Sequence, residues 1–163
     1  MNKAVFIDRD GVINSDEGHY YIYKTEDFKI NEGVIPSLKM LQEAGYLLIV
    51  ISNQSGIAKG LYSKTDTDKI HDSLKNMMAK EKIQLTEIYY CPHHPDQGRC
   101  ICRKPDSLMI EKAIARFDID IKKSFLIGDS ARDVEAALKV GLKGIRVHKN
   151  TNIYEVCSSF IHI

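Results

Sequence analysis

The residues best suited to chemistry are aspartates that follow short apolar segments. Asp8 and Asp10 come directly after the run Ala4–Ile7, and Asp129 comes just after the run Ser124–Ile127. Several carboxylates in one pocket repel one another unless a cation is bound among them. Acidic ligands that offer only oxygen suit a hard ion that keeps part of its water shell, and Mg²⁺ fits best. The pattern therefore predicts a magnesium site, with Asp133 close to it.

Two aspartates separated by one residue can perform different steps of the hydrolysis of a phosphate ester. One carboxylate has to be ionised in order to attack phosphorus. The other has to carry a proton for the leaving oxygen and then accept one from the attacking water. We assign the attack to Asp8, at the end of the apolar run, and the acid/base role to Asp10. The chemistry predicted is phosphoryl transfer through an aspartyl-phosphate.

Other polar residues could hold the phosphoryl group. Ser52 and Asn53 follow the apolar run Tyr46–Ile51 and supply a hydroxyl and an amide. Lys104 supplies a positive charge, with Arg103 beside it. Positioning and charge stabilisation do most of the work in phosphoryl transfer, so these groups are candidates for stabilising the reacting phosphate.

A second cluster combines three cysteines with a histidine. Cys91, His93, Cys100 and Cys102 lie within twelve residues, and tetrahedral zinc requires four ligands of this kind. Reduced free cysteines and a redox pair are the alternatives, and His94 is the competing imidazole. A zinc ion with four protein ligands has no open position, so we expect a structural role. It would fold the polar loop 91–102, which leads directly into the two basic residues.

The remaining pattern predicts the elements that position these residues. Five short apolar runs read as strands: Ala4–Ile7, Tyr46–Ile51, Ile88–Tyr90, Ser124–Ile127 and Gly144–Val147. Between them, four segments have helical spacing: Gly33–Ala44, Thr65–Lys82, Ser107–Phe117 and Ser130–Val140. This alternation is typical of a three-layer α/β fold with a parallel sheet buried on both faces. Function in such sheets gathers beyond the carboxyl ends of the strands, which would bring the aspartates together.

The bulk composition excludes several classes of protein. The 163 residues fit a single domain, 1–163, and the net charge of +1 carries no basic stripe for nucleic acid. No apolar stretch approaches the roughly 20 residues of a membrane helix, so we expect a cytoplasmic protein, and a monomer. We expect His71 and His148 on the surface, and Cys157 buried in a C-terminal helix.

Together the motifs resemble those of the haloacid dehalogenase superfamily. They are Asp8-x-Asp10-Gly11, Ser52-Asn53, Lys104 and Gly128-Asp129-x₃-Asp133. The resemblance implies a Rossmann-like core with Asp8 as the nucleophile and Asp10 as the general acid/base. It also implies that Mg²⁺ is held by Asp8, by the backbone carbonyl of Asp10 and by Asp129.

Longer runs resemble one family of that superfamily, the phosphatases of heptose bisphosphate and histidinol phosphate. These runs are Asp8–Asn14, Asn53–Gly60, Cys91–Pro95 and Cys102–Pro105. The family lacks a cap domain. The resemblance implies that Ser52 and Lys104 stabilise the phosphoryl group and that further residues contact the substrate: Asp16, Gly18, His19, Asn53, Gln54, Ser55, Arg103 and Ser130. Ser130 stands where relatives carry Lys or Arg.

The resemblance implies a phosphomonoesterase acting on a small phosphorylated sugar or alcohol. We expect it to remove the C7 phosphate of D-glycero-D-manno-heptose 1,7-bisphosphate, in a pathway to lipopolysaccharide or surface-glycan precursors. The alternative within the family is histidinol-phosphate phosphatase. Outside it, a receiver domain phosphorylated on aspartate also has a parallel sheet, clustered acids and a lysine, but it has no need for a second aspartate at Asp10.

Overall fold

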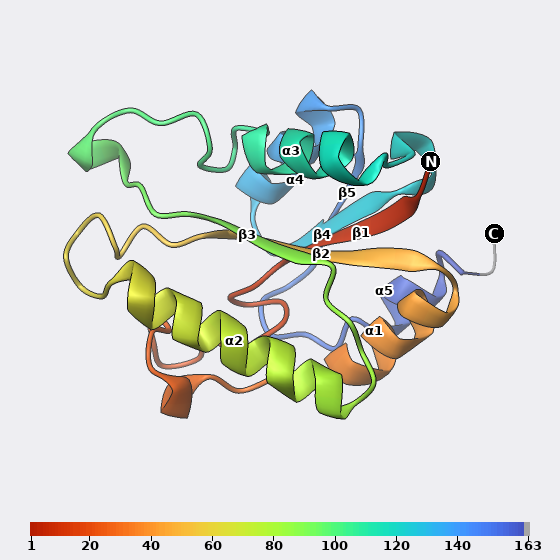
Figure 1. The fold of residues 1–163 in the computed structure, drawn as a ribbon, viewed down its shortest axis with the longest axis horizontal. Helices are drawn as coiled ribbons and strands as arrows, with labels where there is room; N and C mark the ends of the chain where they lie inside the picture. The colour runs from red at the N-terminus through yellow and green to blue at the C-terminus, as the bar shows by residue number, and fades with distance from the viewer. Residues whose placement is uncertain (162–163) are drawn as a thin grey trace.

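The computed structural model describes residues 1–161 and contains a five-stranded parallel sheet with helices on both faces (Figure 1). The strand order is β3-β2-β1-β4-β5, so the first strand lies at the centre. The strands are β1 (Lys3–Asp8), β2 (Tyr46–Asn53), β3 (Glu87–Cys91), β4 (Phe125–Gly128) and β5 (Lys143–Arg146). The predicted three-layer α/β class with a parallel sheet is confirmed.

Within residues 1–161, five α-helices cover the sheet. They are α1 (Val34–Glu43), α2 (Lys64–Lys80), α3 (Leu108–Phe117), α4 (Ala131–Lys139) and α5 (Tyr154–Ser158). In Figure 1, α3 and α4 lie above the sheet, whereas α1, α2 and α5 lie below it. The four helices predicted from apolar spacing are all present, with no end shifted by more than two residues, and Cys157 is buried in the C-terminal helix as expected.

The central strands alternate their side chains between two apolar cores. Val5 and Ile7 of β1 point to the core under α1 and α2, while Ala4 and Phe6 point to the core under α3 and α4. All four are completely buried. Burial on both faces explains why the first strand has a continuous apolar sequence rather than an alternating one.

The expectation of burial on both faces was wrong for the two edge strands. Four of the five residues of β3 are only partly buried, and none of the four residues of β5 is buried. An edge strand has one neighbour instead of two, and the helices cover it less completely. Leu138 of α4 is 64% exposed although it is apolar, because it lies on the solvent side of that helix.

The topology places the carboxyl ends of three strands side by side. Asp8, the last residue of β1, pairs with Ile51 of β2, and Ile7 pairs with Ile127 of β4. The chain moves outward from β1 through β2 to β3 and then crosses back to β4 on the other side of β1. A reversal of this kind opens a crevice at the carboxyl ends of the strands, where ligands bind.

No helix in the described part of the chain combines the length and the apolar character that crossing a bilayer requires.

Candidate active site

Three carboxylates converge beyond the ends of β1 and β4. One oxygen each of Asp8, Asp129 and Asp133 lies within 4.8 Å of the others. Asp8 closes β1, Asp129 directly follows β4, and Asp133 lies in the first turn of α4. The convergence predicted from the strand-end rule is therefore present in the structure.

Lys104 lies between two of these acids. Its Nζ atom is 2.8 Å from Asp8 Oδ1 and 2.6 Å from Asp133 Oδ1, and the side chain is almost completely buried. The backbone of Lys104 is held by Asn53, whose Oδ1 accepts from the Lys104 N–H at 3.0 Å and whose Nδ2 donates to the Lys104 carbonyl at 3.1 Å. Asn53 ends β2, so two strand ends fix the position of this ammonium group.

Burial and mutual repulsion shape the protonation of the acids. Burial raises the pKa of Asp8 well above its usual range, and the negative charges of Asp133 and Asp129 add to the effect of burial although Lys104 opposes it. Burial also raises the pKa of Asp129, again with a contribution from Asp133. Although burial disfavours charge on Asp133 too, the adjacent Lys104 holds the pKa of Asp133 below its ordinary value.

These donors fit a divalent cation. Asp8 and Asp129 have raised pKa values, so a nearby positive charge would favour the ionised form of both. Asp133 is differently placed, because its Oδ1 accepts from Lys104 and its Oδ2 accepts from the N–H and the hydroxyl of Ser130 at 3.1 and 3.0 Å. The oxygens of Asp133 are thus already used, and Asp8 and Asp129 are the carboxylates best able to hold the ion.

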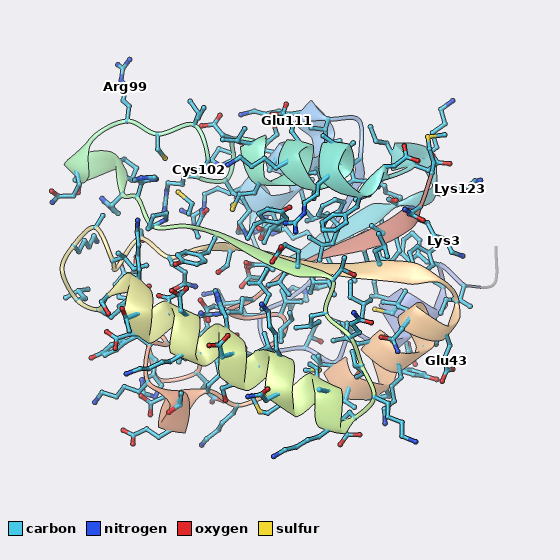
Figure 2. The ribbon with its side chains drawn as sticks, in the orientation of Figure 1. Lys3, Glu43, Arg99, Cys102, Glu111 and Lys123 are labelled. Atoms are coloured by element: carbon cyan, nitrogen blue, oxygen red, sulfur yellow. The ribbon has the colours of Figure 1, made fainter. Side chains whose placement is uncertain are left out.

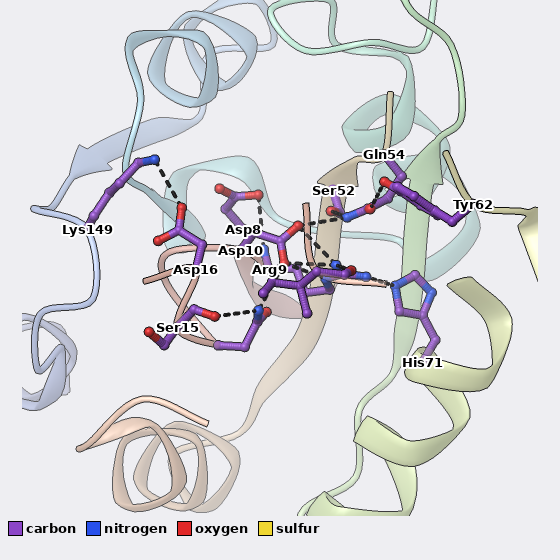
Figure 3. Close-up of polar contacts among 12 residues, drawn as sticks. Asp8, Arg9, Asp10, Ser15, Asp16, Ser52, Gln54, Tyr62, His71 and Lys149 are labelled. Carbon is purple, nitrogen blue, oxygen red and sulfur yellow. Dashed lines mark hydrogen bonds and ion pairs between the residues drawn. The ribbon is translucent and has the colours of Figure 1, made fainter. Parts of the chain in front are cut away.

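The carboxylate of Asp10 is held by three neighbouring side chains (Figure 3). Arg9 donates from Nε and Nη2 to Oδ1 at 3.0 and 2.8 Å, and Nη2 also reaches Oδ2 at 3.0 Å. Asn14 Nδ2 donates to Oδ1 and Gln54 Nε2 donates to Oδ2, each at 2.9 Å. Asp10 also lines the pocket, so these three side chains fix the orientation in which its carboxylate faces the site.

Gln54 and Ser52 lie behind the site, where they bind each other. Gln54 Nε2 donates to Ser52 Oγ at 2.7 Å as well as to Asp10, while Gln54 Oε1 accepts from the hydroxyl of Tyr62 at 2.6 Å. Both residues are almost completely buried, and neither lines the pocket. Gln54 contacts Asp10 and Ser52 in this structure, and its contact with substrate stays a prediction. The phosphoryl contact of Ser52 stays a prediction.

A pocket of about 360 Å³ opens above the acids. It is lined by most of the predicted site residues, namely Asp8, Asp10, Asp16, His19, Asn53, Ser55, Arg103, Lys104, Asp129 and Ser130. Gly18 is exposed and does not line it. The pocket also contains Asp133, which sequence analysis placed close to the metal, and five residues that it did not assign to this site: Tyr20, Tyr21, His94, Arg132 and Lys149. Arg132, two residues from Ser130, adds a positive charge to the lining of the pocket.

The surface position expected for His71 was wrong. His71 is only 5% exposed, and its Nε2 atom lies 3.2 Å from Nη1 of the buried Arg9. His71 follows Ile70 on α2, and the apolar spacing of that helix gave no indication that the next residue also faces inward. The other surface expectation, for His148, is correct.

The cysteine cluster is assembled in the loop after β3. Cys91 Sγ lies 2.9 Å from Cys102 Sγ and 3.8 Å from Cys100 Sγ, and His93 Nδ1 lies 3.2 Å from Cys102 Sγ. Tetrahedral zinc with bonds of about 2.3 Å to sulfur would hold sulfur atoms about 3.8 Å apart. The number and type of donors fit this ion, as does the distance between Cys91 and Cys100, whereas Cys91 and Cys102 would have to move apart to bind it. Figure 2 shows Cys102 turned inward, whereas Arg99 at the tip of the loop points outward.

His93, and not His94, belongs to this cluster. His94 Nδ1 instead accepts from the backbone N–H of Asp96 at 3.1 Å, and its ring lines the pocket. Burial raises the pKa of the Cys91 thiol well above its ordinary value. Zinc binds thiolates, so loading of this cluster would release protons.

The parallel sheet, the acids at its central strand ends and the buried lysine define a phosphatase of the haloacid dehalogenase class. A solved structure similar to this chain is D,D-heptose 1,7-bisphosphate phosphatase from B. bronchiseptica, complexed with magnesium and phosphate. Its TM-score is 0.83 at 30% identity, with 96% of this chain and 86% of that chain covered.

Sequence comparisons agree with the structural one. The family model of polynucleotide kinase 3 phosphatase matches residues 3–152. D-glycero-beta-D-manno-heptose-1,7-bisphosphate 7-phosphatase from Haemophilus influenzae is 38% identical over 148 residues, which are 88% of this chain and 79% of the relative. D-glycero-alpha-D-manno-heptose-1,7-bisphosphate 7-phosphatase from Campylobacter jejuni is 43% identical over 140 residues, which are 86% of this chain and 78% of the relative. The chain therefore belongs to the polynucleotide kinase 3 phosphatase family and, within it, to the D-glycero-D-manno-heptose-1,7-bisphosphate 7-phosphatases.

Proposed function

We propose that the chain is a magnesium-dependent phosphatase that removes the 7-phosphate of D-glycero-D-manno-heptose 1,7-bisphosphate through an aspartyl-phosphate on Asp8. The observation that carries the proposal is the meeting of Asp8 and Asp129 beside the buried ammonium group of Lys104. A nucleophile, a cation site and a fixed positive charge within one pocket are the parts that phosphoryl transfer requires.

The reaction proceeds in two steps on the side chains of Asp8 and Asp10. In the first step a carboxylate oxygen of Asp8 bonds to phosphorus, the bond between phosphorus and the sugar oxygen breaks, and Asp10 gives its proton to that oxygen. In the second step water attacks the phosphorus of the aspartyl-phosphate and gives a proton to Asp10. The bond between phosphorus and Asp8 then breaks, which releases phosphate and restores both carboxyl groups.

Charge in the site supports these steps. Magnesium bound by Asp8, Asp129 and the backbone carbonyl of Asp10 would neutralise part of the charge on the phosphoryl oxygens. Although burial opposes charge on Lys104, Asp8 and Asp133 raise its pKa above the ordinary value, so it stays protonated at working pH. Asp133 serves to orient Lys104, since its oxygens already accept from Lys104 and Ser130.

The rim of the pocket suits a substrate with a second phosphate. Arg103, Arg132 and Lys149 line the pocket and supply positive charge outside the buried core. All three lie far from Asp8 and Asp10 in the sequence. Guanidinium groups bind phosphate through paired hydrogen bonds. The names of the relatives support a heptose bisphosphate, and both anomers occur among them.

A phosphate-release panel tests this function. The substrates are both anomers of the heptose 1,7-bisphosphate, histidinol phosphate and fructose 1,6-bisphosphate, each with and without Mg²⁺. We expect one heptose anomer to have the highest kcat/KM, with release lost when Mg²⁺ is removed. Preference for histidinol phosphate would overturn the substrate, and undiminished release in the absence of divalent cations would overturn the role of the metal.

We also propose that Cys91, His93, Cys100 and Cys102 hold a structural zinc ion whose task is to fix Arg103. The Arg103 side chain donates from Nη1 to the carbonyl of the ligand residue His93 at 3.4 Å. Lys104, by contrast, is held by Asn53, Asp8 and Asp133, which do not belong to the loop. The proposal includes a monomer in the cytoplasm, where the thiols stay reduced.

Removal of zinc should therefore weaken substrate binding more than it slows chemistry. In protein stripped with a strong chelator, dialysed and resupplied with Mg²⁺, we expect KM to rise about tenfold with kcat within about twofold, since only the outer binding charge is displaced. Metal analysis and steady-state kinetics provide the measurement. Return of the wild-type KM after zinc is added back is the control, and an unchanged KM in folded, zinc-free protein would contradict the proposal.

A further inference from the structure

A line of three side chains connects helix α2 to the carboxylate of Asp10. Arg9 is completely buried despite its charge, and its guanidinium lies between Asp10 and His71. Nε and Nη2 contact Asp10 at 3.0 and 2.8 Å, and Nη1 contacts His71 Nε2 at 3.2 Å. Figure 3 shows His71 reaching this guanidinium from the side away from Asp16 and Lys149.

The partner determines the tautomer of His71. A guanidinium has only N–H donors and stays protonated, so His71 Nε2 is the acceptor and the ring proton sits on Nδ1. Burial and the positive charge of Arg9 lower the pKa of His71 to about 3, although Asp10 opposes the shift. His71 is therefore a neutral acceptor at working pH, and it does not exchange protons during turnover.

His71 occupies a rigid position. Its neighbour Ile70 is completely buried in the core beneath the sheet, as is Leu74 one turn later. The ring also packs against the ring of Tyr90 from β3 in a T-shaped arrangement, with 5.3 Å between centroids. The long side chain of Arg9 is held at its far end by this ring and by the carbonyl of Ile22, to which Nη2 donates at 2.8 Å.

We propose that His71 is a positioning residue for proton transfer: by accepting from Arg9, it fixes the guanidinium that holds the Asp10 carboxylate toward the leaving oxygen. The inference rests on the proposed function of Asp10 as the acid. Proton transfer requires Asp10 within hydrogen-bond distance of that oxygen, and a displacement of about 1 Å in a reacting group can cost about 100-fold in rate. Without His71, the guanidinium loses one of its three contacts and can tilt with Asp10.

Leaving-group dependence separates this role from a merely structural one. An alkoxide leaving group needs the proton of Asp10, whereas 4-nitrophenolate leaves without it. In His71→Leu we expect kcat/KM to fall about 10- to 100-fold for the best alkyl phosphate of the panel and less than about threefold for 4-nitrophenyl phosphate. His71→Gln, whose amide oxygen can accept from Arg9, should recover most of the loss. If His71→Leu does not fold, His71→Phe replaces it.

Two further variants complete the experiment. Asp66→Ala removes the capping box that Asp66 forms with Ser63 at the start of α2, so it destabilises the same helix without contacting Arg9. This variant should leave the ratio of the kcat/KM values for the two substrates unchanged. Equal losses on both substrates in His71→Leu, or no loss on the alkyl phosphate, would overturn the role of His71. Asp10→Asn is the reference variant for loss of the acid. Full activity of that variant on the alkyl phosphate would overturn the assignment of Asp10 as the general acid.

Discussion

Asp8→Asn should abolish phosphate release, with kcat below about one ten-thousandth of the wild-type value, because the amide nitrogen and oxygen cannot replace an ionised carboxylate as the nucleophile. The same change removes one of the acids that hold the metal. Phosphate release from the preferred substrate of the panel, measured with saturating Mg²⁺, checks the prediction. Turnover within about tenfold of wild type would overturn the nucleophile assignment.

The fold of this variant has to be verified, because Asp8 is buried and in contact with Lys104. We expect Asp8→Asn to fold, since the change removes a carboxyl group whose pKa is already raised by burial and by two acidic neighbours. Circular dichroism and thermal unfolding without metal provide this control. Asp72→Asn, on the exposed face of α2, is a matched Asp-to-Asn change that should alter neither activity nor stability.

Asp10→Asn should slow both half-reactions, because the asparagine cannot give a proton to the leaving oxygen or accept one from water. For an alkyl phosphate we expect kcat/KM to fall by about 10²- to 10⁴-fold, which is the usual contribution of a general acid. For 4-nitrophenyl phosphate the first step should be nearly normal and the second slow, so that the aspartyl-phosphate accumulates. Mass spectrometry of rapidly quenched protein would detect the phosphate on Asp8.

A matched control for this variant is Asp16→Asn. Asp16 also lines the pocket, but its carboxylate accepts from Lys149 Nζ and Asn150 Nδ2, each at 3.0 Å, and contacts neither Asp8 nor Asp10. Its effect should fall on KM and should be equal for alkyl and aryl substrates. If Asp10→Asn behaved like Asp16→Asn, with no leaving-group dependence and no phosphoenzyme, Asp10 would not be the acid/base.

Much of the fold could be predicted because its signals are local. Runs such as Ala4–Ile7 are apolar and short, and helices such as α1 have a regular spacing of buried residues, so the order of elements follows from sequence. The degree of burial of β3 and β5 could not be predicted. It depends on their position at the sheet edges, and strand order is a property of the whole chain.

The site was predictable to the same extent. The types and spacing of Asp8, Asp10 and Asp129, combined with the rule that parallel strands end together, were enough to place them in one pocket. The cysteine cluster could also be predicted, because its four members lie close together in sequence. By contrast, the hydrogen bond from Gln54 to Asp10 was not predicted, because a motif does not specify on which side of the loop a side chain points.

By itself, then, the sequence determined the class of chemistry and the residues proposed to carry it, since reactive groups and their local spacing are properties of neighbouring residues. Only the tertiary structure decided which groups support them: Lys104 between Asp8 and Asp133, and His71 behind Arg9. The physical reason is that these contacts join segments separated by dozens of residues. The contacts of Asp133 and His71 also depend on how α4 and α2 are rotated against the sheet, and apolar spacing alone does not define that rotation for residues at the border of a buried helix face.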